Sequence, residues 1–466
     1  MLSLLILLTL VIQQITNNSP KFITLPFKIQ KYTYKPDKEG LLRDHLYKDI
    51  SLTLSIGTPK QEIPMLIGFG EYTTYILSNK VNGYDGIAKY NKELSTTYKT
   101  NQKYSELFFY QIFNEAFRSN ENLYLQNPDY TLKNFEFLLA TEIGVNICYL
   151  PYCEILTQPG VIGLRMSDSE GLNEPVNTTN FITQLRNKEI INNYDFTFLF
   201  GDNDNGTLII GEKPDEYDNE HYDKENFVFT KTYIDNAKEK DWCLMFDNIF
   251  YGNEKLINDK TMIMRVEYGL IDGDKRWQKI LENNFFNELI SKGICFKGKG
   301  YNDGHSYYHY YCDKTVDLSN FKPFTFVLND LNYNLTLTKD DLFKVEDDKV
   351  LFLMIFGHYN LILGMPFFKK YQFVFNQRAK TIGLYTKING VPVPPIPAPI
   401  ISNANYKNKN LKILTWAGIF IGAIILVCFI CKYYGKYRAN KKKTILVIGG
   451  SKQDIQMAEY REMNSE

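Results

Sequence analysis

The sequence contains very little histidine, with 5 such residues among 466. It also has no excess charge of either sign, since 53 basic residues balance 53 acidic ones. Binding to the phosphates of nucleic acid needs a basic surface, so the composition indicates no nucleic-acid partner. The 34 tyrosines and 32 phenylalanines are typical of strands and favour a β-rich domain over a metal-rich one. We therefore expect neither a cofactor nor a metal.

Two short polar segments could be mistaken for metal sites. His305 and His309 stand in a tyrosine-rich stretch without a third ligand, which predicts the surface of a loop. Asp272, Gly273 and Asp274 are too few for a calcium loop, so the sequence predicts a solvated turn there.

Long apolar runs are confined to the two ends of the chain. Residues 1–17 begin with an apolar run too short to cross a bilayer and are expected to be a signal peptide. Residues 411–431 are long and apolar enough to span, and a lysine-rich tail, 432–466, follows them. The positive-inside rule then predicts a single-pass type I protein, with residues 21–387 lumenal or extracellular and a proline-rich stalk over 388–410. A buried core helix followed by a charged surface is the alternative to the span.

An oxidising compartment permits disulfides among the 7 cysteines. Cys148 and Cys153 could close a small loop, and Cys295 and Cys312 bracket a Gly-, Asn- and Tyr-rich excursion and form a natural second pair. Cys243 stands in a strand-like run and is expected to be buried. Three asparagines are glycan acceptors if the predicted topology holds: Asn177, Asn205 and Asn334.

The segment between the two ends consists of short β-segments separated by turns. Residues 50–56 alternate between apolar and polar and stop at a Gly-Thr-Pro turn, and residues 196–200 and 207–210 flank a hairpin turn. Convincing helices are few and lie over 179–187 and 277–291. The fold class is therefore all-β.

Four stretches resemble the pepsin-like (A1-type) aspartic protease family, in the family's order. They are residues 50–62 (ISLTLSIGTPKQE), 160–164 (GVIGL), 196–212 (FTFLFGDNDNGTLIIGE) and 361–384 (LILGMPFFKKYQFVFNQRAKTIGL). The resemblance implies two β-lobes around a central cleft, an N-lobe over about 21–205 and a C-lobe over about 206–387. It also implies a disulfide at the position of the Cys295 to Cys312 excursion.

Catalysis in this family depends on two aspartates, one from a loop of each lobe. Two carboxylates held close together cannot both ionise, so they share one proton. The ionised carboxylate takes a proton from a water molecule, while the other donates to the scissile carbonyl oxygen.

Both aspartate positions are substituted in this chain, according to the resemblance. The first holds Gly68, followed by Phe69, and the second holds Glu267, followed by Tyr268. Phe69 and Tyr268 are expected to remove hydroxyl bonds between the loops and to occupy the place of the water. Tyr110 corresponds to the tyrosine of the mobile flap. A displaced acid is the alternative, with Glu71, Asp272 and Asp274 as its candidates.

The resulting hypothesis is a membrane-anchored, catalytically inactive pseudoprotease whose cleft binds a peptide or protein ligand. Whether the chain is an enzyme stays open at this point. One alternative is an active endopeptidase that uses Glu267 and a non-standard partner, and another is a structural or adhesive surface protein.

Overall fold

The computed structural model describes most of the predicted ectodomain. The described residues are 22–31, 43–46, 48–81, 88–104, 113–126, 129–143, 159–166, 180–201, 203–233, 241–302, 305–331, 333–357, 361–388 and 391–392. Several predicted features lie outside these residues: the signal peptide, most of the stalk, the membrane span, the tail, Tyr110, Cys148, Cys153 and Asn177. Within the described ranges, no helix has the length and apolar character needed to cross a bilayer.

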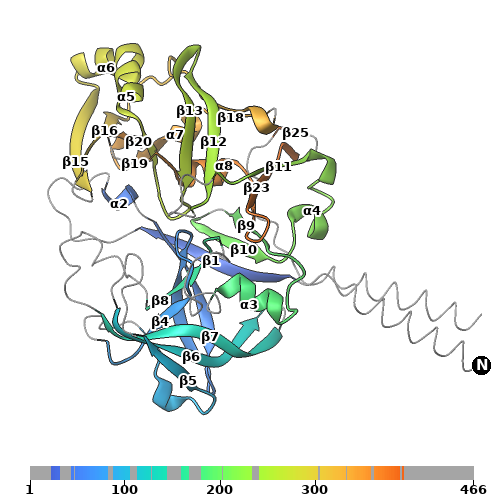
Figure 1. Ribbon diagram of the computed structural model, residues 1–466. Helices are drawn as coiled ribbons and strands as arrows, with labels where there is room; N and C mark the ends of the chain where they lie inside the picture. Colours follow the sequence, from blue (N-terminus) through green and yellow to red (C-terminus); the bar gives the residue numbers. More distant parts are fainter. Residues whose placement is uncertain are drawn as a thin grey trace, which may run out of the picture. The chain divides into compact units, whose positions relative to one another are not determined.

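Strands dominate the structure, as the sequence predicts, and they form two large sheets (Figure 1). The larger sheet has 13 strands in the order β11-β23-β22-β9-β10-β1-β2-β3-β8-β4-β7-β6-β5. Its strands are β1 (Ile23–Lys31), β2 (Lys48–Ile56), β3 (Gln61–Gly68), β4 (Tyr75–Leu77), β5 (Lys99–Tyr104), β6 (Phe113–Gln126), β7 (Asp129–Ile143), β8 (Gly160–Gly163), β9 (Asp195–Phe200), β10 (Asn205–Ile210), β11 (Phe227–Lys231), β22 (Phe373–Asn376) and β23 (Thr381–Tyr385).

The second sheet has 10 strands and comes from the C-terminal half of the domain. Its strands are β12 (Cys243–Tyr251), β13 (Glu254–Met264), β14 (Ile271–Gly273), β15 (Cys295–Asn302), β16 (His305–Asp313), β17 (Phe324–Leu328), β18 (Tyr333–Leu337), β19 (Phe343–Glu346), β20 (Lys349–Phe356) and β21 (Ile362–Leu363). A small pair, β24 (Lys387–Ile388) and β25 (Val391–Pro392), follows.

The predicted boundary between lobes, near residues 205 and 206, falls at the start of β10, inside the larger sheet. This sheet also contains β22 and β23, which come from the C-terminal end of the domain, and β22 pairs directly with β9. All six residues of β9 are buried, and strands flank it on both sides. The two ends of the domain are therefore joined by one shared sheet.

The helices are short and sit at the ends of strands. They are α2 (Arg43–Leu46), η1 (Lys92–Leu94), α3 (Phe181–Asn187), α4 (Pro214–Tyr217), η4 (Lys224–Asn226), α5 (Lys275–Leu281), η5 (Glu282–Phe286), α6 (Asn287–Ser291), η6 (Asn329–Leu331), α7 (Lys339–Leu342) and α8 (Met365–Lys370). The two predicted helices are confirmed as α3 and as the continuous run from α5 through η5 to α6. Asn180 caps α3 by accepting from the amide of Thr183, and Asp274 caps α5 by accepting from that of Arg276.

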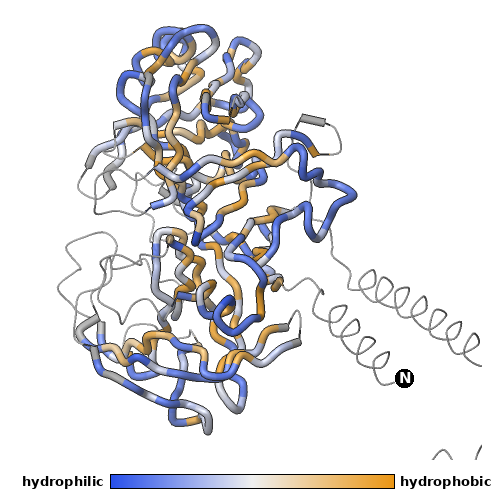
Figure 2. Tube along the Cα trace, turned by 45° about the vertical axis from the view of Figure 1, so that its right-hand side comes forward, coloured by the Kyte–Doolittle hydropathy of each residue, from blue (hydrophilic) through white to orange (hydrophobic). Residues whose placement is uncertain are grey.

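Alternating residues build the core. In β2, the apolar side chains of residues 50, 52, 54 and 56 are all buried, and the polar ones between them are mostly more exposed. Figure 2 shows hydrophobic segments along the interior strands and hydrophilic segments on the outer turns. A buried carboxylate, Glu121, ties β6 to the segment before β5, accepting from the Tyr90 hydroxyl at 2.5 Å and the Ser95 hydroxyl at 2.6 Å.

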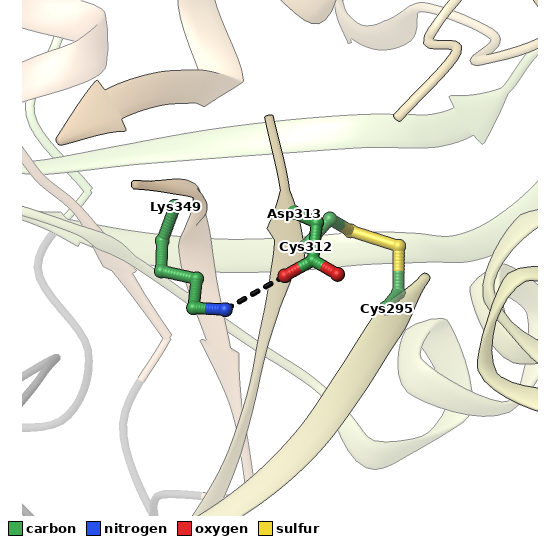
Figure 3. Close-up of a disulfide and its surroundings, with 4 residues drawn as sticks. All are labelled: Cys295, Cys312, Asp313 and Lys349. Atoms are coloured by element: carbon green, nitrogen blue, oxygen red, sulfur yellow. Dashed lines mark hydrogen bonds and ion pairs between the residues drawn. A yellow bond between two sulfur atoms is a disulfide. The ribbon is translucent and has the colours of Figure 1, made fainter. Parts of the chain in front are cut away.

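The predicted bond between Cys295 and Cys312 is present and joins directly paired residues of β15 and β16 (Figure 3). Beside it, the amine of Lys349 lies 2.7 Å from the carboxylate of Asp313. Cys243 is buried, as expected.

The prediction of a histidine-bearing surface loop is wrong, because both histidines lie on β16. His309 is buried there, and burial lowers the pKa of its ring to about 4. The prediction of a solvated turn at Asp272 is wrong as well. Asp272 lies fully buried in β14, and burial raises the pKa of its carboxyl well above the usual range.

Candidate functional site

The first candidate loop begins where β3 ends, at Gly68. There β3 runs parallel to β8, with Gly68 opposite Gly163. The chain then turns, as the amide of Glu71 donates to the carbonyl of Gly68 at 3.2 Å. It returns through β4, which pairs with β8 in the opposite direction from Tyr75 onward. Two strands thus flank β8, and residues 68–74 form the loop between them.

The second sheet repeats this arrangement after β13. There β13 runs parallel to β21, with Met264 opposite Leu363, and β14 pairs antiparallel to the same strand through Asp272. The turn repeats too, as the amide of Tyr268 donates to the carbonyl of Arg265 at 3.2 Å. Arg265 therefore takes the position that Gly68 takes in the first loop.

This register corrects the prediction for the second aspartate position. The resemblance assigned Glu267, but the strand pairing places Arg265 there, and Glu267 corresponds to Gly70. The error arose from Gly269, which was matched to the family's loop glycine. Gly269 is required for another reason: a Cβ atom on it would lie 2.0 Å from the carbonyl oxygen of His45 in α2.

Gly68 is packed too tightly to carry a side chain. A Cβ atom at this position would lie 2.6 Å from a methyl carbon of Val161 and 2.9 Å from Cβ of Glu71. Position 68 therefore provides neither a carboxylate nor the space for one.

The two aromatic residues of the loops do not lie where the sequence suggested. Phe69 points into the core, where it is 1% exposed. Its ring packs within 6.2 Å, centre to centre, of five others: Phe196, Phe198, Trp242, Phe368 and Phe375. Tyr268 is buried in a second apolar cluster with Leu46, Leu270, Tyr307, Leu351 and Ile355. The prediction that these residues occupy the place of the catalytic water is therefore wrong.

Five charged side chains gather between the two loops, and we call them the central ionic cluster. They are Glu71 and Arg165, which follow strands of the larger sheet, and Asp241, Arg265 and Glu267, which flank strands of the second sheet. One carboxylate oxygen of Asp241 lies 2.9 Å from Nη2 of Arg265, and the other lies 3.7 Å from Nε of Arg165. Asp241 therefore bridges an arginine that follows a strand of each sheet. Arg265 also lies 3.5 Å from Glu267.

Gly70 makes room for this cluster. A Cβ atom on Gly70 would lie 1.2 Å from Nη1 of Arg265, so the guanidinium rests directly on the glycine backbone. Two further bonds fix the neighbouring chain: the Trp242 indole donates to the carbonyl of Leu164 at 3.2 Å, and the Gln377 amide donates to that of Arg165 at 2.6 Å.

Burial and neighbouring charges shift the pKa values of two acids in the cluster. Burial raises the pKa of Glu71 to about 7, against the opposing effect of Arg265 and Arg165. Burial also raises the pKa of Glu267, and Arg265 again opposes the shift.

Sequence reasoning named Glu71 and Glu267 but missed Asp241, Arg165 and Arg265. Two signals were available: Arg165 directly follows the G-V-I-G-L segment, and Arg265 directly follows the apolar end of β13. Of the predicted glycan acceptors, Asn205 and Asn334 lie exposed on β10 and β18.

A separate cavity of about 380 Å³ lies beside the second loop. Its lining includes the apolar residues Ile29 and Met365 together with lysines and aspartates. Lys370 pairs with Asp341 at 2.5 Å, so part of this charge is compensated within the protein.

Residues 51–387 match the sequence profile of a protein family described as eukaryotic aspartyl protease. No curated protein matches the chain.

Proposed function

Because this chain belongs to the eukaryotic aspartyl protease family, we propose that its domain is catalytically inactive and binds a peptide or protein ligand. The observation that carries this proposal is the pair of residues at equivalent loop positions, Gly68 and Arg265. Glycine holds no proton, and a guanidinium stays protonated and cannot act as a base. Neither residue can share a proton with the other or orient a water molecule as two carboxylates do.

A cleavage assay tests the inactivity. Full-length protein in detergent should not digest a denatured substrate at acid pH, and statine-type inhibitors should bind weakly. General acid–base help is worth about 10²–10⁴-fold per group, so loss of both carboxylates should leave activity near background. Robust hydrolysis that statine-type compounds inhibit would overturn the proposal.

One observation favours a second candidate, an active endopeptidase with Glu71 and Glu267 as its acids. Burial raises the pKa of Glu71 to about 7, and the charge of Glu267 adds to this shift. The same two acids lie beside two arginines, which stabilise their charged forms and oppose the sharing of a proton. Glu71→Gln and Glu267→Gln separate the candidates, since each would abolish activity only in a working enzyme. Activity that survives both substitutions would indicate contamination or another site.

Ligand binding can be tested by selecting peptides from a random displayed library on the full-length protein. Selected peptides should lose at least about tenfold in affinity when Arg265→Glu reverses the charge at the centre, equivalent to ~1.4 kcal/mol. Arg276→Glu is the matched control, because the Arg276 side chain is exposed at the start of α5 and forms a local ion pair with Asp274 at 2.9 Å. A failed selection, or equal loss in both variants, would favour the structural or adhesive alternative.

The membrane anchoring is proposed from the two apolar ends. The proposal includes a cleaved signal peptide, a lumenal or extracellular domain and glycans on the predicted acceptors. Protease added outside sealed vesicles or intact cells should spare only a fragment beginning near residue 411. Protection of the domain instead would contradict this topology.

A further inference from the structure

A lysine on the wall of the separate cavity beside the second loop contacts a buried histidine. Lys48, at the start of β2, and His45, on α2, both line this cavity of about 380 Å³. The amine of Lys48 lies 3.4 Å from Nδ1 of His45, whose side chain is 4% exposed. An ammonium group can only donate, so Nδ1 is the acceptor and the His45 ring is neutral. The cavity therefore presents an amine in contact with a base.

A carboxylate lies on the other side of the His45 ring. Nε2 of His45 lies 2.6 Å from an oxygen of Glu346, the last residue of β19. The negative charge of Glu346 stabilises the imidazolium that forms when Nδ1 takes a proton. The sequence of contacts from Glu346 through His45 to Lys48 is thus that of an acid, a base and a nucleophile. Contacts between a nucleophile and its base are often as loose as 3.4 Å before a ligand binds.

The wall that carries Lys48 is held against the second loop. A Cβ atom on Gly269 would lie 3.2 Å from Cε of Lys48, so the lysine stem runs along the backbone of this loop. The amide of Lys48 donates to the carbonyl of Glu267 at 2.8 Å. The amide of Gly269 donates to the carbonyl of Leu46 at 2.9 Å, which fixes α2 to the same loop. These contacts give the amine a defined position.

We propose that Lys48 forms an imine with a small aldehyde that has an apolar body. Ligand sites usually enclose about 300–1,000 Å³, and the volume of this cavity lies within that range. Apolar residues from several elements share its lining, among them Ile29, Leu353 and Met365. This activity lies beyond the proposed function, because no member of the central ionic cluster lines the cavity.

The reaction balances without an oxidant or a reductant. His45 takes a proton from the Lys48 ammonium, and the amine nitrogen then attacks the carbonyl carbon. A second proton moves from this nitrogen to the carbonyl oxygen, which gives a carbinolamine. Its hydroxyl group leaves as water with the proton that His45 returns, and a carbon–nitrogen double bond forms. One ammonium and one aldehyde therefore give one protonated imine and one water.

Reductive trapping on the full-length protein tests the imine. The probe is hydrocinnamaldehyde, with cyanoborohydride to reduce the imine to a stable secondary amine, in a buffer and detergent without amines. Peptide mass mapping should find Lys48 modified on the order of 10²-fold faster than Lys28, the lower end of what a positioned base contributes. Lys28 is the matched control, because it is exposed on β1 and its side chain points to the opposite face from that of Ile29. Equal rates at the two lysines would overturn the proposal.

Two variants test the roles of the base and the acid. His45→Gln should lower the rate at Lys48 to that of Lys28. It should also give Lys48 the steep pH dependence of an ordinary lysine, whose free amine increases about tenfold per pH unit. Glu346→Gln leaves the base in place, so it should give an intermediate rate and keep the shallower pH dependence of the unmodified protein. An undiminished rate in His45→Gln would contradict the role of the histidine.

A third variant tests the cavity and leaves the reacting groups unchanged. Leu353→Trp fills part of the space, so Lys48 should lose its preference for hydrocinnamaldehyde over acetaldehyde, while Lys28 reacts as before. An unchanged preference would place the reaction outside the cavity and overturn the proposal. If His45→Gln fails to fold, the comparison of Lys48 with Lys28 in the unmodified protein still decides.

Discussion

Replacing Gly70 by alanine should displace the Arg265 guanidinium from the centre of the molecule. The added methyl would lie 1.2 Å from Nη1 and 2.4 Å from Cζ of Arg265, so both cannot remain. Gly70 does not have positive φ, and alanine therefore meets no backbone strain of its own. The side chain has to swing away and lose its 2.9 Å bond to Asp241.

The expected loss in the free energy of unfolding follows from the lost bond between Arg265 and Asp241. Hydrogen bonds between charged groups contribute about 1.5–3 kcal/mol, and partial exposure of Arg265 favours a value near 2 kcal/mol. Unfolding entropy near 2.1 cal/mol/K per residue gives roughly 0.7 kcal/mol per kelvin for a domain of this size, so the melting temperature should fall by about 3 °C.

A double-mutant cycle with Arg265→Ala identifies the cause. Without the guanidinium, Gly70→Ala should cost less than about 0.5 kcal/mol, since glycine-to-alanine changes at compatible sites are neutral or stabilising. Arg276→Ala serves as the control for removing an arginine from an exposed ion pair. If the stability losses of Gly70→Ala and Arg265→Ala simply add in the double variant, the contact between the two residues is refuted.

Other substitutions address the core and the cross-links. Phe69→Ala should reduce the free energy of unfolding by about 3–5 kcal/mol, because it empties the centre of an aromatic cluster; a loss below 1 kcal/mol in denaturant titration would place this ring elsewhere. Serine at both Cys295 and Cys312 should cost about 3 kcal/mol by freeing the loop between them, and peptide mapping that finds both thiols free in the native protein would contradict the bond itself. Glu121→Gln should cost about 1–2 kcal/mol, because a buried acceptor of three hydroxyl bonds, from Tyr90, Ser95 and Thr97, loses its charge; Glu93→Gln, on the surface, should change the melting temperature little.

Local patterns predicted much of the fold, while side-chain placement at the site depended on distant pairings. The alternation in residues 50–56 and the helix over 277–291 are properties of neighbouring residues, and both were predicted. The position of Arg265 depends instead on the register of β13 against β21, which lies far along the chain. A slip of two residues in that register preserves the pattern of buried faces, so hydrophobic periodicity could not detect it.

The sequence also could not predict in which direction a single side chain points. Phe69 and Gly70 are adjacent, yet one completes the core and the other supports a guanidinium at the centre. The same limitation applies to Asp272, where polarity predicted solvent and β14 carries the residue into the interior. A charged residue in a short strand is placed by its neighbours on both sides, and these come from other parts of the chain.

The shared sheet has a consequence for folding during translation. Strand β9 is wholly buried, and its neighbour on one side is β22, with Thr197 opposite Val374. During translation the ribosome completes β9 long before it reaches β22, so an apolar strand waits with one edge unpaired. The nascent chain therefore exposes this edge over the interval, and a product truncated before Phe373 retains an open strand edge that favours aggregation.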